Sequence, residues 1–310
     1  MLTSLPILTI EAHSRCNCRC GMCDIWRSPE HRSFTPEQLQ SQLESLDQLG
    51  TKHVVFTGGE PLMNPHLFTL CGVLRKRGIR ITLLSTGLLL ERYAARIRAS
   101  IDDVIVSLDG PSELHDRIRG VPGAFASLTR GVHALRDLPV SARCVVQQRN
   151  CGMLLATADT AESLGVRSIS FLAADVTTSA FGRNEVWPQL RQDDVCVTRA
   201  QLPELETQIS LLAGHLLVAD SPAHLARIVQ LFRSHLGLAA PQAPRCNAPF
   251  VSAYLRLDGS VQPCFFHKAH SSGHDLLETL NSPEAAAFRN TLDPATNPVC
   301  QSCVCSLYLA

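Results

Sequence analysis

The sequence lacks an excess of charge, a targeting segment and any long apolar run. Lysine plus arginine and aspartate plus glutamate each number 28, so the formal net charge is zero and no field draws in nucleic acid or an anionic membrane. No apolar stretch approaches the roughly 18 residues that span a bilayer, and no charged segment precedes an apolar signal region. We therefore expect a cytoplasmic protein that has neither nucleic acid nor membrane as a partner.

Disulfide bonds are not expected either. The chain has thirteen cysteines, an odd number, and thiols stay reduced in the cytoplasm. The isolated cysteines are expected to be small apolar core residues: Cys71, Cys144, Cys151 and Cys196. The other cysteines gather in residues 16–23 and in residues 246–310, which points to metal ligation.

The pattern of apolar runs predicts an α/β fold. Over the first 172 of 310 residues, short apolar runs alternate with amphipathic stretches, as in a parallel sheet. The six expected strands lie near residues 7–12, 53–57, 79–84, 104–108, 142–147 and 168–172. Six strand-helix units predict a (β/α)6 partial TIM barrel over residues 1–175, with functional groups at the carboxyl ends of the strands. Residues 176–245 are expected to form a helical bridge, and residues 246–310 a small second domain.

The first cysteine group reads "CNCRCGMC" and contains the spacing CxxxCxxC in Cys16, Cys20 and Cys23. Three thiolates hold three irons of a 4Fe-4S cluster and leave the fourth iron open to a small molecule, which points to chemistry. Four thiolates also satisfy zinc, so a zinc site is the alternative. Cys18 is expected not to ligate, because a fourth thiolate would close the open iron.

A second motif, "FTGGEP", follows the second strand and contains Gly58, Gly59 and Glu60. Paired glycines let backbone amides approach a ligand closely, and the carboxylate suits an ammonium group. The two motifs, in this order and each after its own strand, resemble the radical S-adenosylmethionine (SAM) superfamily. The resemblance implies that the three cysteines bind the catalytic cluster and that the glycine-glycine-glutamate turn binds the amino group of S-adenosylmethionine.

Further residues follow from the same resemblance. "VSLDG" resembles the family's fourth-strand segment, which makes Ser107 and Asp109 candidates for the ribose hydroxyls. "LLSTG" resembles the third-strand segment, with Ser85 in place of the usual threonine. Arg143 is a candidate partner of the methionyl carboxylate, with a surface ion pair as the equal alternative. In "HDRIRG", Asp116, Arg117 and Arg119 are interpreted as a solvated charge cluster, with a position at the barrel mouth as the alternative.

The second cysteine group resembles the SPASM and twitch extensions of the same superfamily. Asp258 and Gly259 predict a tight hairpin that brings Cys264 back toward Cys246, and Cys300 and Cys303 supply a CxxC pair. These four thiolates suffice for one auxiliary 4Fe-4S cluster, so two clusters are expected in all, with Cys305 as the spare. A structural zinc ribbon is the alternative.

The resemblance implies an enzyme that cleaves S-adenosylmethionine reductively to a 5′-deoxyadenosyl radical and abstracts hydrogen from its substrate. A small molecule is expected (a sugar, a cyclitol, or a cofactor or natural-product precursor), since no leader-binding segment precedes the first strand, with net oxidation through the auxiliary cluster as an option. The alternative is a maturase of a ribosomally made peptide. A remote alternative is a non-catalytic iron-sulfur or zinc scaffold. The electron donor is expected to be a flavodoxin or ferredoxin.

Overall fold

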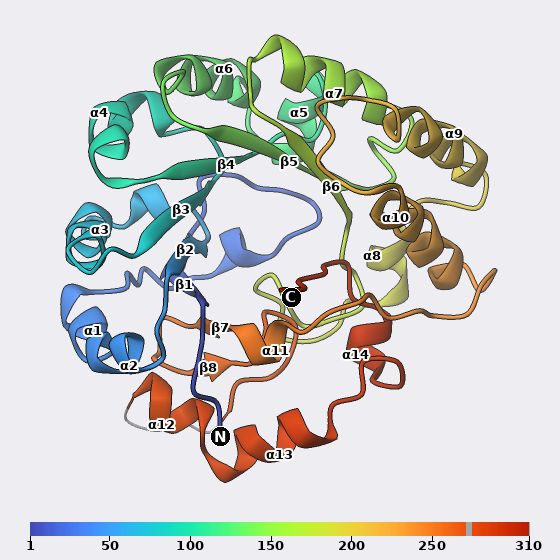
Figure 1. The fold of residues 1–310 in the computed structure, drawn as a ribbon. Coiled ribbons are helices and arrows are strands. Elements are labelled where there is room, and N and C mark those ends of the chain that lie inside the picture. Colours follow the sequence, from blue (N-terminus) through green and yellow to red (C-terminus); the bar gives the residue numbers. More distant parts are fainter. Residues whose placement is uncertain (271–274, 310) are drawn as a thin grey trace.

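The computed structural model describes residues 1–270 and 275–309 and shows an open, curved sheet with helices on its outer face (Figure 1). Residues 271–274 and 310 of the expected C-terminal unit lie outside the described residues. The strands are β1 (Ile7–His13), β2 (His53–Gly58), β3 (Arg80–Ser85), β4 (Asp103–Ser107), β5 (Val140–Val146), β6 (Ile169–Ala173), β7 (Ser252–Leu255) and β8 (Val261–Gln262). Six parallel strands, β1 to β6, lie in sequence order and form the expected partial barrel, which does not close.

The helices cover the outside of this sheet. They are α1 (Pro36–Gln40), α2 (Leu43–Gln48), α3 (Leu67–Arg75), α4 (Leu90–Ser100), α5 (Ser112–Arg119), α6 (Ala124–Ala134), α7 (Leu154–Ser163), α8 (Gln189–Asp193), α9 (Leu202–Leu212), α10 (Pro222–His235), α11 (Ala248–Val251), α12 (Leu276–Leu280), α13 (Pro283–Thr291) and α14 (Pro298–Gln301), with 3₁₀ turns at Ile25–Arg27 and Pro61–Met63. Burial alternates along β4, β5 and β6, so one face packs on the helices and the other lines the barrel interior. No helix among these has the length and apolar character needed to cross a bilayer.

Local sequence signals explain where several helices begin. Thr35 and Gln38 form a reciprocal capping box at the start of α1, as their spacing predicts. Ser221 caps α10, with Pro222 in the first turn. The chain from Pro36 to Gln48 forms two helices, α1 and α2, which are separated by Ser41 and Gln42.

The C-terminal hairpin does not form a sheet of its own. Strands β7 and β8 pair antiparallel, as Asp258 and Gly259 predict, but β7 also pairs in parallel with β1 from Ile7↔Ser252 to Ile10↔Leu255. The result is one eight-stranded sheet in the order β6-β5-β4-β3-β2-β1-β7-β8. An open barrel leaves β1 with unpaired backbone groups, and the hairpin satisfies them.

The opposite edge of the sheet, β6, is covered by the segment between α9 and α10. Ile169 donates its backbone N–H to Leu217 and accepts from Ala219, while the Asp220 carboxylate accepts from the Phe171 N–H at 2.7 Å. Both edges of the open barrel are therefore paired. In Figure 1 the loop after β1, the loop after β6 and the C-terminal tail all project over the interior of the sheet.

Candidate active site

The first cysteine group lies on the loop that follows β1, at the carboxyl end of the strand. Cys16 and Cys23 are partly buried, whereas Cys20 is 6% exposed and Cys18 fully buried. The loop is held by its own backbone, since Cys23 donates to the Cys20 carbonyl at 3.3 Å and the Trp26 indole N–H donates to the same carbonyl at 3.1 Å. Three thiols expected to act as ligands are thus presented at one mouth of the barrel.

The four thiols of this loop influence one another. Hydrogen bonds to Cys16 and Cys20 raise the pKa of Cys18, so it keeps its proton. The hydrogen bond from Cys18 lowers the pKa of Cys20 to about 7, and burial raises that of Cys23 to about 12. Cys18 is fully buried in the loop, and its exclusion from the ligands stays a prediction.

An iron-sulfur cluster and a single zinc ion are the two alternatives for each cysteine group. Zinc binds sulfur at about 2.3 Å, so two sulfur ligands of one ion lie no more than about 4.6 Å apart. Among the described residues, Asp159, Glu162 and His215 are the one set that brings three metal-ligating atoms within 4.8 Å of one another. This set has two exposed carboxylates, a common arrangement without an ion. The choice between an iron-sulfur cluster and zinc at the two cysteine groups therefore depends on the chemistry of their motifs.

The glycine-glycine-glutamate turn lies directly beneath the cysteine loop. Gly59 donates to the His13 carbonyl and Glu60 to the Arg15 carbonyl, both at 2.9 Å. A Cβ on Gly59 would lie 2.0 Å from the Arg15 carbonyl oxygen, and Gly58 has φ +121°. Because the backbones touch here, glycine is required at both positions. The turn fixes where the cysteine loop begins.

The Glu60 carboxylate is completely buried and bound by its own chain. It accepts from the Leu62 N–H at 3.0 Å, from the Ser85 hydroxyl at 3.1 Å and from the Thr86 N–H and hydroxyl at 2.7 Å. Burial raises the pKa of Glu60 against these hydrogen bonds. Ser85 is expected from the sequence to contact the cofactor, but its hydroxyl donates to Glu60. This hydrogen bond connects the carboxyl end of β3 to the turn that follows β2.

Two of the expected cofactor residues lie side by side on the interior face. Ser107 on β4 is the register partner of Arg143 on β5, and both are partly exposed. Arg143 Nε donates to the Ser170 hydroxyl of β6 at 3.3 Å. A hydroxyl and a guanidinium therefore face the barrel interior from neighbouring strands, near the mouth where the cysteine loop lies.

Asp109 is placed differently from the expectation. Its side chain is 0% exposed, it accepts from the Val145 N–H at 2.9 Å, and its Oδ2 lies 2.6 Å from Arg119 Nη2. Burial raises the pKa of Asp109, and the Arg119 charge opposes that rise. A carboxylate enclosed in this way does not favour the expected contact with ribose hydroxyls.

The "HDRIRG" segment is wrongly interpreted from sequence as a solvated charge cluster. It forms the end of α5, where His115 and Arg119 are buried. His115 Nδ1 accepts from the Asp109 N–H at 3.2 Å, and Asp116 accepts from the Gly123 and Phe125 N–H groups at 2.6 and 2.7 Å. Helix α5 is not among the elements expected from the sequence, although Pro111 before it and Gly120 after it are helix-boundary signals.

The C-terminal cysteines form a second group. Burial raises the pKa of Cys264 to about 11, with further contributions from Cys300 and Cys246. Burial also raises the pKa of Cys303, with further contributions from Cys305, Cys264 and Cys246. The sequence-distant Cys246, Cys264, Cys300 and Cys303 are thus brought together, and Cys305 lies beside them.

Iron content is expected to separate the two candidates for the fourth ligand. Cys303→Ala should lose the second cluster and so about four irons per chain, whereas Cys305→Ala should retain them. Iron and sulfide analysis after anaerobic reconstitution gives the answer. Loss of iron in Cys305→Ala with retention in Cys303→Ala would reverse the assignment.

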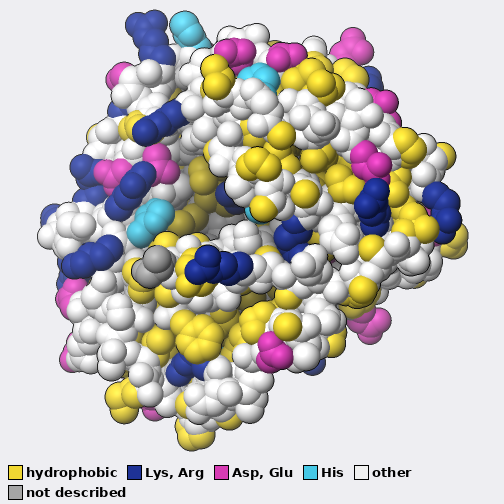
Figure 2. Space-filling view, turned by 45° about the vertical axis from the view of Figure 1, so that its right-hand side comes forward, with side chains coloured by type: hydrophobic (Ala, Val, Ile, Leu, Met, Phe, Trp, Pro, Cys, Tyr) yellow, Lys and Arg dark blue, Asp and Glu magenta, His cyan; other side chains and the backbone are white. Residues whose placement is uncertain are grey.

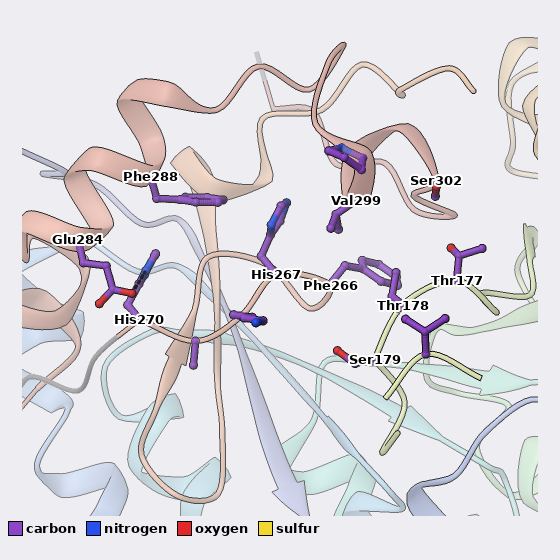
Figure 3. A pocket seen from close by; sticks show the side chains of 14 residues that line it. Thr177, Thr178, Ser179, Phe266, His267, His270, Glu284, Phe288, Val299 and Ser302 are labelled. Atoms are coloured by element: carbon purple, nitrogen blue, oxygen red, sulfur yellow. Dashed lines mark ion pairs between the residues drawn. The ribbon is translucent and has the colours of Figure 1, made fainter. Parts of the chain in front are cut away.

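A cavity of about 580 Å³ lies beside the second cysteine group (Figure 3). The loop after β6 lines one wall through Thr177 and Thr178, and the C-terminal unit lines the other through Phe266, His267 and Val299. His267 Nε2 lies 3.5 Å from the Cys300 sulfur. In the space-filling view, hydrophobic side chains are visible inside a hollow with basic groups near its rim (Figure 2).

A buried ion pair fastens the loop after β6 to the first cysteine loop. Arg183 Nη1 lies 2.6 Å from Asp175 Oδ2, both side chains are 1% exposed, and Arg183 also donates to the Met22 carbonyl at 3.1 Å. Cys23 Sγ contacts the Phe181 carbonyl at 3.8 Å. This segment has no periodicity from which the pair can be predicted.

Breaking this pair is expected to cost stability. Arg183→Met leaves Asp175 buried without its cation, which should lower the free energy of unfolding by about 3–5 kcal/mol. The double variant Arg183→Met/Asp175→Asn removes the orphaned charge and should recover much of the loss. Urea unfolding of the cluster-free proteins measures both, and equal stability of wild type and Arg183→Met would contradict the prediction.

Comparison with known proteins identifies two sequence families along the chain. A family model for the radical SAM superfamily matches residues 10–148, and the SPASM model, an iron-sulfur cluster-binding domain, matches residues 246–304. The first match contains the cysteine loop, the glycine-glycine-glutamate turn and α5. The second contains four cysteines of the C-terminal group, and Cys305 follows directly after it.

Individual relatives are distant. An AdoMet-dependent heme synthase of Oleidesulfovibrio alaskensis is 34% identical over 142 residues, covering 43% of this chain and 36% of that protein. The subtilosin biosynthesis protein AlbA of Bacillus subtilis is 26% identical over 287 residues, covering 89% and 59%. The chain thus spans between about a third and three-fifths of these relatives. The crystal structure of Streptococcus suis SuiB bound to precursor peptide SuiA has a TM-score of 0.69 at 16% identity, covering 99% of this chain and 73% of SuiB, which shows a shared fold.

Proposed function

We propose that the chain is a radical SAM enzyme with a SPASM-type iron-sulfur domain, as the family models that match residues 10–148 and 246–304 indicate. It abstracts a hydrogen atom from an unactivated C–H bond of its substrate. The observation that carries this proposal is the cysteine loop at the barrel mouth, seated on the Gly59 and Glu60 turn. Ser107 and Arg143 face the same interior. A second cysteine group lies on the unit that β7 joins to β1.

The residues divide into those that hold cofactors and those that shape the site. Cys16, Cys20 and Cys23 would hold the catalytic cluster, and the turn at Gly58 to Glu60 would receive the amino group of S-adenosylmethionine. Arg143 would pair with its carboxylate. When bound, these groups supply a strongly reducing iron and a sulfonium whose cleavage yields the hydrogen-abstracting carbon radical.

The protein's own task is to position the substrate and to exclude water. The loop after β6 closes over the cysteine loop through Arg183, which reaches the Met22 carbonyl. Aromatic rings of Phe181, Phe265 and Phe266 pack edge to face between this loop and the C-terminal unit, with centroids 4.9 to 6.1 Å apart. Such a wall limits the access of solvent from that side.

The C-terminal thiols are proposed to hold one auxiliary cluster. Cys246, Cys264, Cys300 and Cys303 would be its ligands, and one of them, Cys300, contacts His267 of the cavity lining. When bound, such a cluster would accept electrons from an oxidised substrate. The expected cytoplasmic location agrees with thirteen cysteines, all of which are free thiols. A flavodoxin or ferredoxin is proposed as electron donor.

Two substrate classes remain in competition. A small molecule is favoured by the relative named as a heme synthase. A peptide is favoured by AlbA, because that match runs through both the barrel and the C-terminal unit. Cell fractions that stimulate 5′-deoxyadenosine release should discriminate between them: protease treatment abolishes stimulation by a peptide and leaves stimulation by a small molecule intact.

The reaction class is tested on the wild-type chain. Anaerobic reconstitution should give about eight irons and eight sulfides per chain, four per cluster. Reduction with dithionite in the presence of S-adenosylmethionine should then release 5′-deoxyadenosine. One or two zinc ions, no visible absorbance and no product with any fraction would favour the scaffold alternative and overturn the proposal.

A further inference from the structure

Arg119 lies against the first cysteine loop as a buried cation. It is 6% exposed, its Nη1 lies 3.7 Å from the sulfur of Cys20, and its Nη2 lies 2.6 Å from Asp109 Oδ2. Its Nε is buried and has no hydrogen-bond partner among the described residues. The guanidinium therefore spans the space between a fully buried carboxylate and an expected cluster ligand.

Anchoring of α5 does not require this side chain. The backbone alone joins the two segments, because the Arg19 N–H donates to the Arg119 carbonyl at 2.8 Å. A Cβ on Gly120 would lie 2.6 Å from the Arg19 carbonyl oxygen, so the segments are in contact there as well. A buried ion pair is often no more stabilising than apolar residues of the same volume. Stability alone therefore does not explain why the Asp109–Arg119 pair lies beside the Cys20 thiol.

We propose that the Asp109–Arg119 pair sets the reduction potential of the catalytic cluster, with Arg119 as a positioning residue that acts through Cys20. This inference rests on the proposed function. A fixed positive charge beside a cluster sulfur stabilises the reduced cluster, which carries one more negative charge than the oxidised one. Asp109 holds the cation in place and offsets part of its field.

The electrostatics of the surrounding groups agree with this arrangement. Burial by itself would lower the pKa of Arg119, but the adjacent Asp109 carboxylate raises it, so the guanidinium stays charged. Because Asp109 and Arg119 are enclosed together with their side chains 2.6 Å apart, the cation is held at a fixed distance from the Cys20 sulfur.

The two partners should shift the potential in opposite directions. Arg119→Gln removes the cation and should make reduction harder, whereas Asp109→Asn removes the opposing anion and should make it easier. We expect about tenfold in the one-electron reduction equilibrium for each, equivalent to about 59 mV. Arg119→Lys keeps the charge and should lie nearer to wild type than Arg119→Gln.

The measurement is a redox titration of the reconstituted full-length protein followed by electron paramagnetic resonance. The signal that changes on addition of S-adenosylmethionine marks the catalytic cluster, which separates it from the auxiliary cluster. Arg183→Gln is the matched control: it also breaks a buried arginine–aspartate pair at this loop, but Arg183 donates to the Met22 carbonyl, and its charge is the smallest of the influences on the Cys23 thiol. It should shift the potential much less.

The outcomes distinguish this inference from the proposed function. Opposite shifts in Arg119→Gln and Asp109→Asn support it, because damage to the loop would move both in the same direction. Equal potentials, shifts of one sign, or a control as large as Arg119→Gln overturn it while leaving the proposed function intact. If wild type shows no signal that responds to S-adenosylmethionine, the proposed function itself fails. Should Arg119→Gln not fold, Arg119→Lys and Asp109→Asn still decide.

Discussion

Cys20→Ala is expected to abolish 5′-deoxyadenosine release and to remove about half of the bound iron, since a 4Fe-4S cluster does not persist on two thiolates at this loop. Cys20 is the most buried of the three expected ligands, and its neighbours Cys18 and Arg119 stabilise its thiolate. The alanine variant is reconstituted in parallel with wild type, and product is measured by chromatography.

The control is another buried cysteine. Cys71 lies in α3, is 0% exposed and is expected to be a core residue. Cys71→Ala should lose some stability through its small cavity, yet keep its full iron content and product release. Product formation by Cys20→Ala at the wild-type rate would contradict the assignment of the catalytic cluster to this loop.

Gly59→Ala is expected to have an effect nearly as large without touching any ligand. The added Cβ would meet the Arg15 carbonyl oxygen at 2.0 Å and the Cys16 nitrogen at 2.8 Å. Both contacts are with backbone, so the cysteine loop must move as a whole, and a displacement of about 1 Å costs roughly 100-fold in rate. We expect at least that loss in product release, together with incomplete iron incorporation.

Gly21→Ala is the matched substitution within the same loop. Nothing lies within 4 Å of the position that its Cβ would occupy, and its φ lies outside the positive range. It should retain wild-type iron and product, which makes steric contact the cause of the loss in Gly59→Ala. Equal activity of the two variants would show that the contact between the turn and the cysteine loop is dispensable.

Much of the barrel could be predicted from periodicity because its strands are short apolar runs separated by capped helices. All six expected strands are present, and their ends differ from the structure by no more than about two residues. The Asp258–Gly259 turn likewise predicts the hairpin of β7 and β8, and the two strands do pair antiparallel. These features depend on local interactions, which the sequence displays directly.

Features that depend on distant contacts could not be read in the same way. The pairing of β7 with β1 joins residues more than two hundred positions apart. Helix α5 has a strongly charged sequence, and nothing local indicates that Arg119 is buried against Asp109 and Cys20. The cysteine and glycine motifs therefore predict where the candidate site lies. The buried Arg119 and Asp109 beside it are seen only in the tertiary structure.

The parallel ladder between β1 and β7 has a consequence for how this protein can be altered. The C-terminal unit, residues 246–309, is part of the same sheet as the barrel. Its first strand, β7, completes the hydrogen bonding of β1, the strand that precedes the cysteine loop. A chain that ends before residue 246 would leave the backbone N–H and C=O groups on this edge of β1 without partners. We expect such an edge to pair with strands of other molecules and so to cause aggregation. Domain exchange with a relative would therefore succeed only if the transplanted hairpin kept this register.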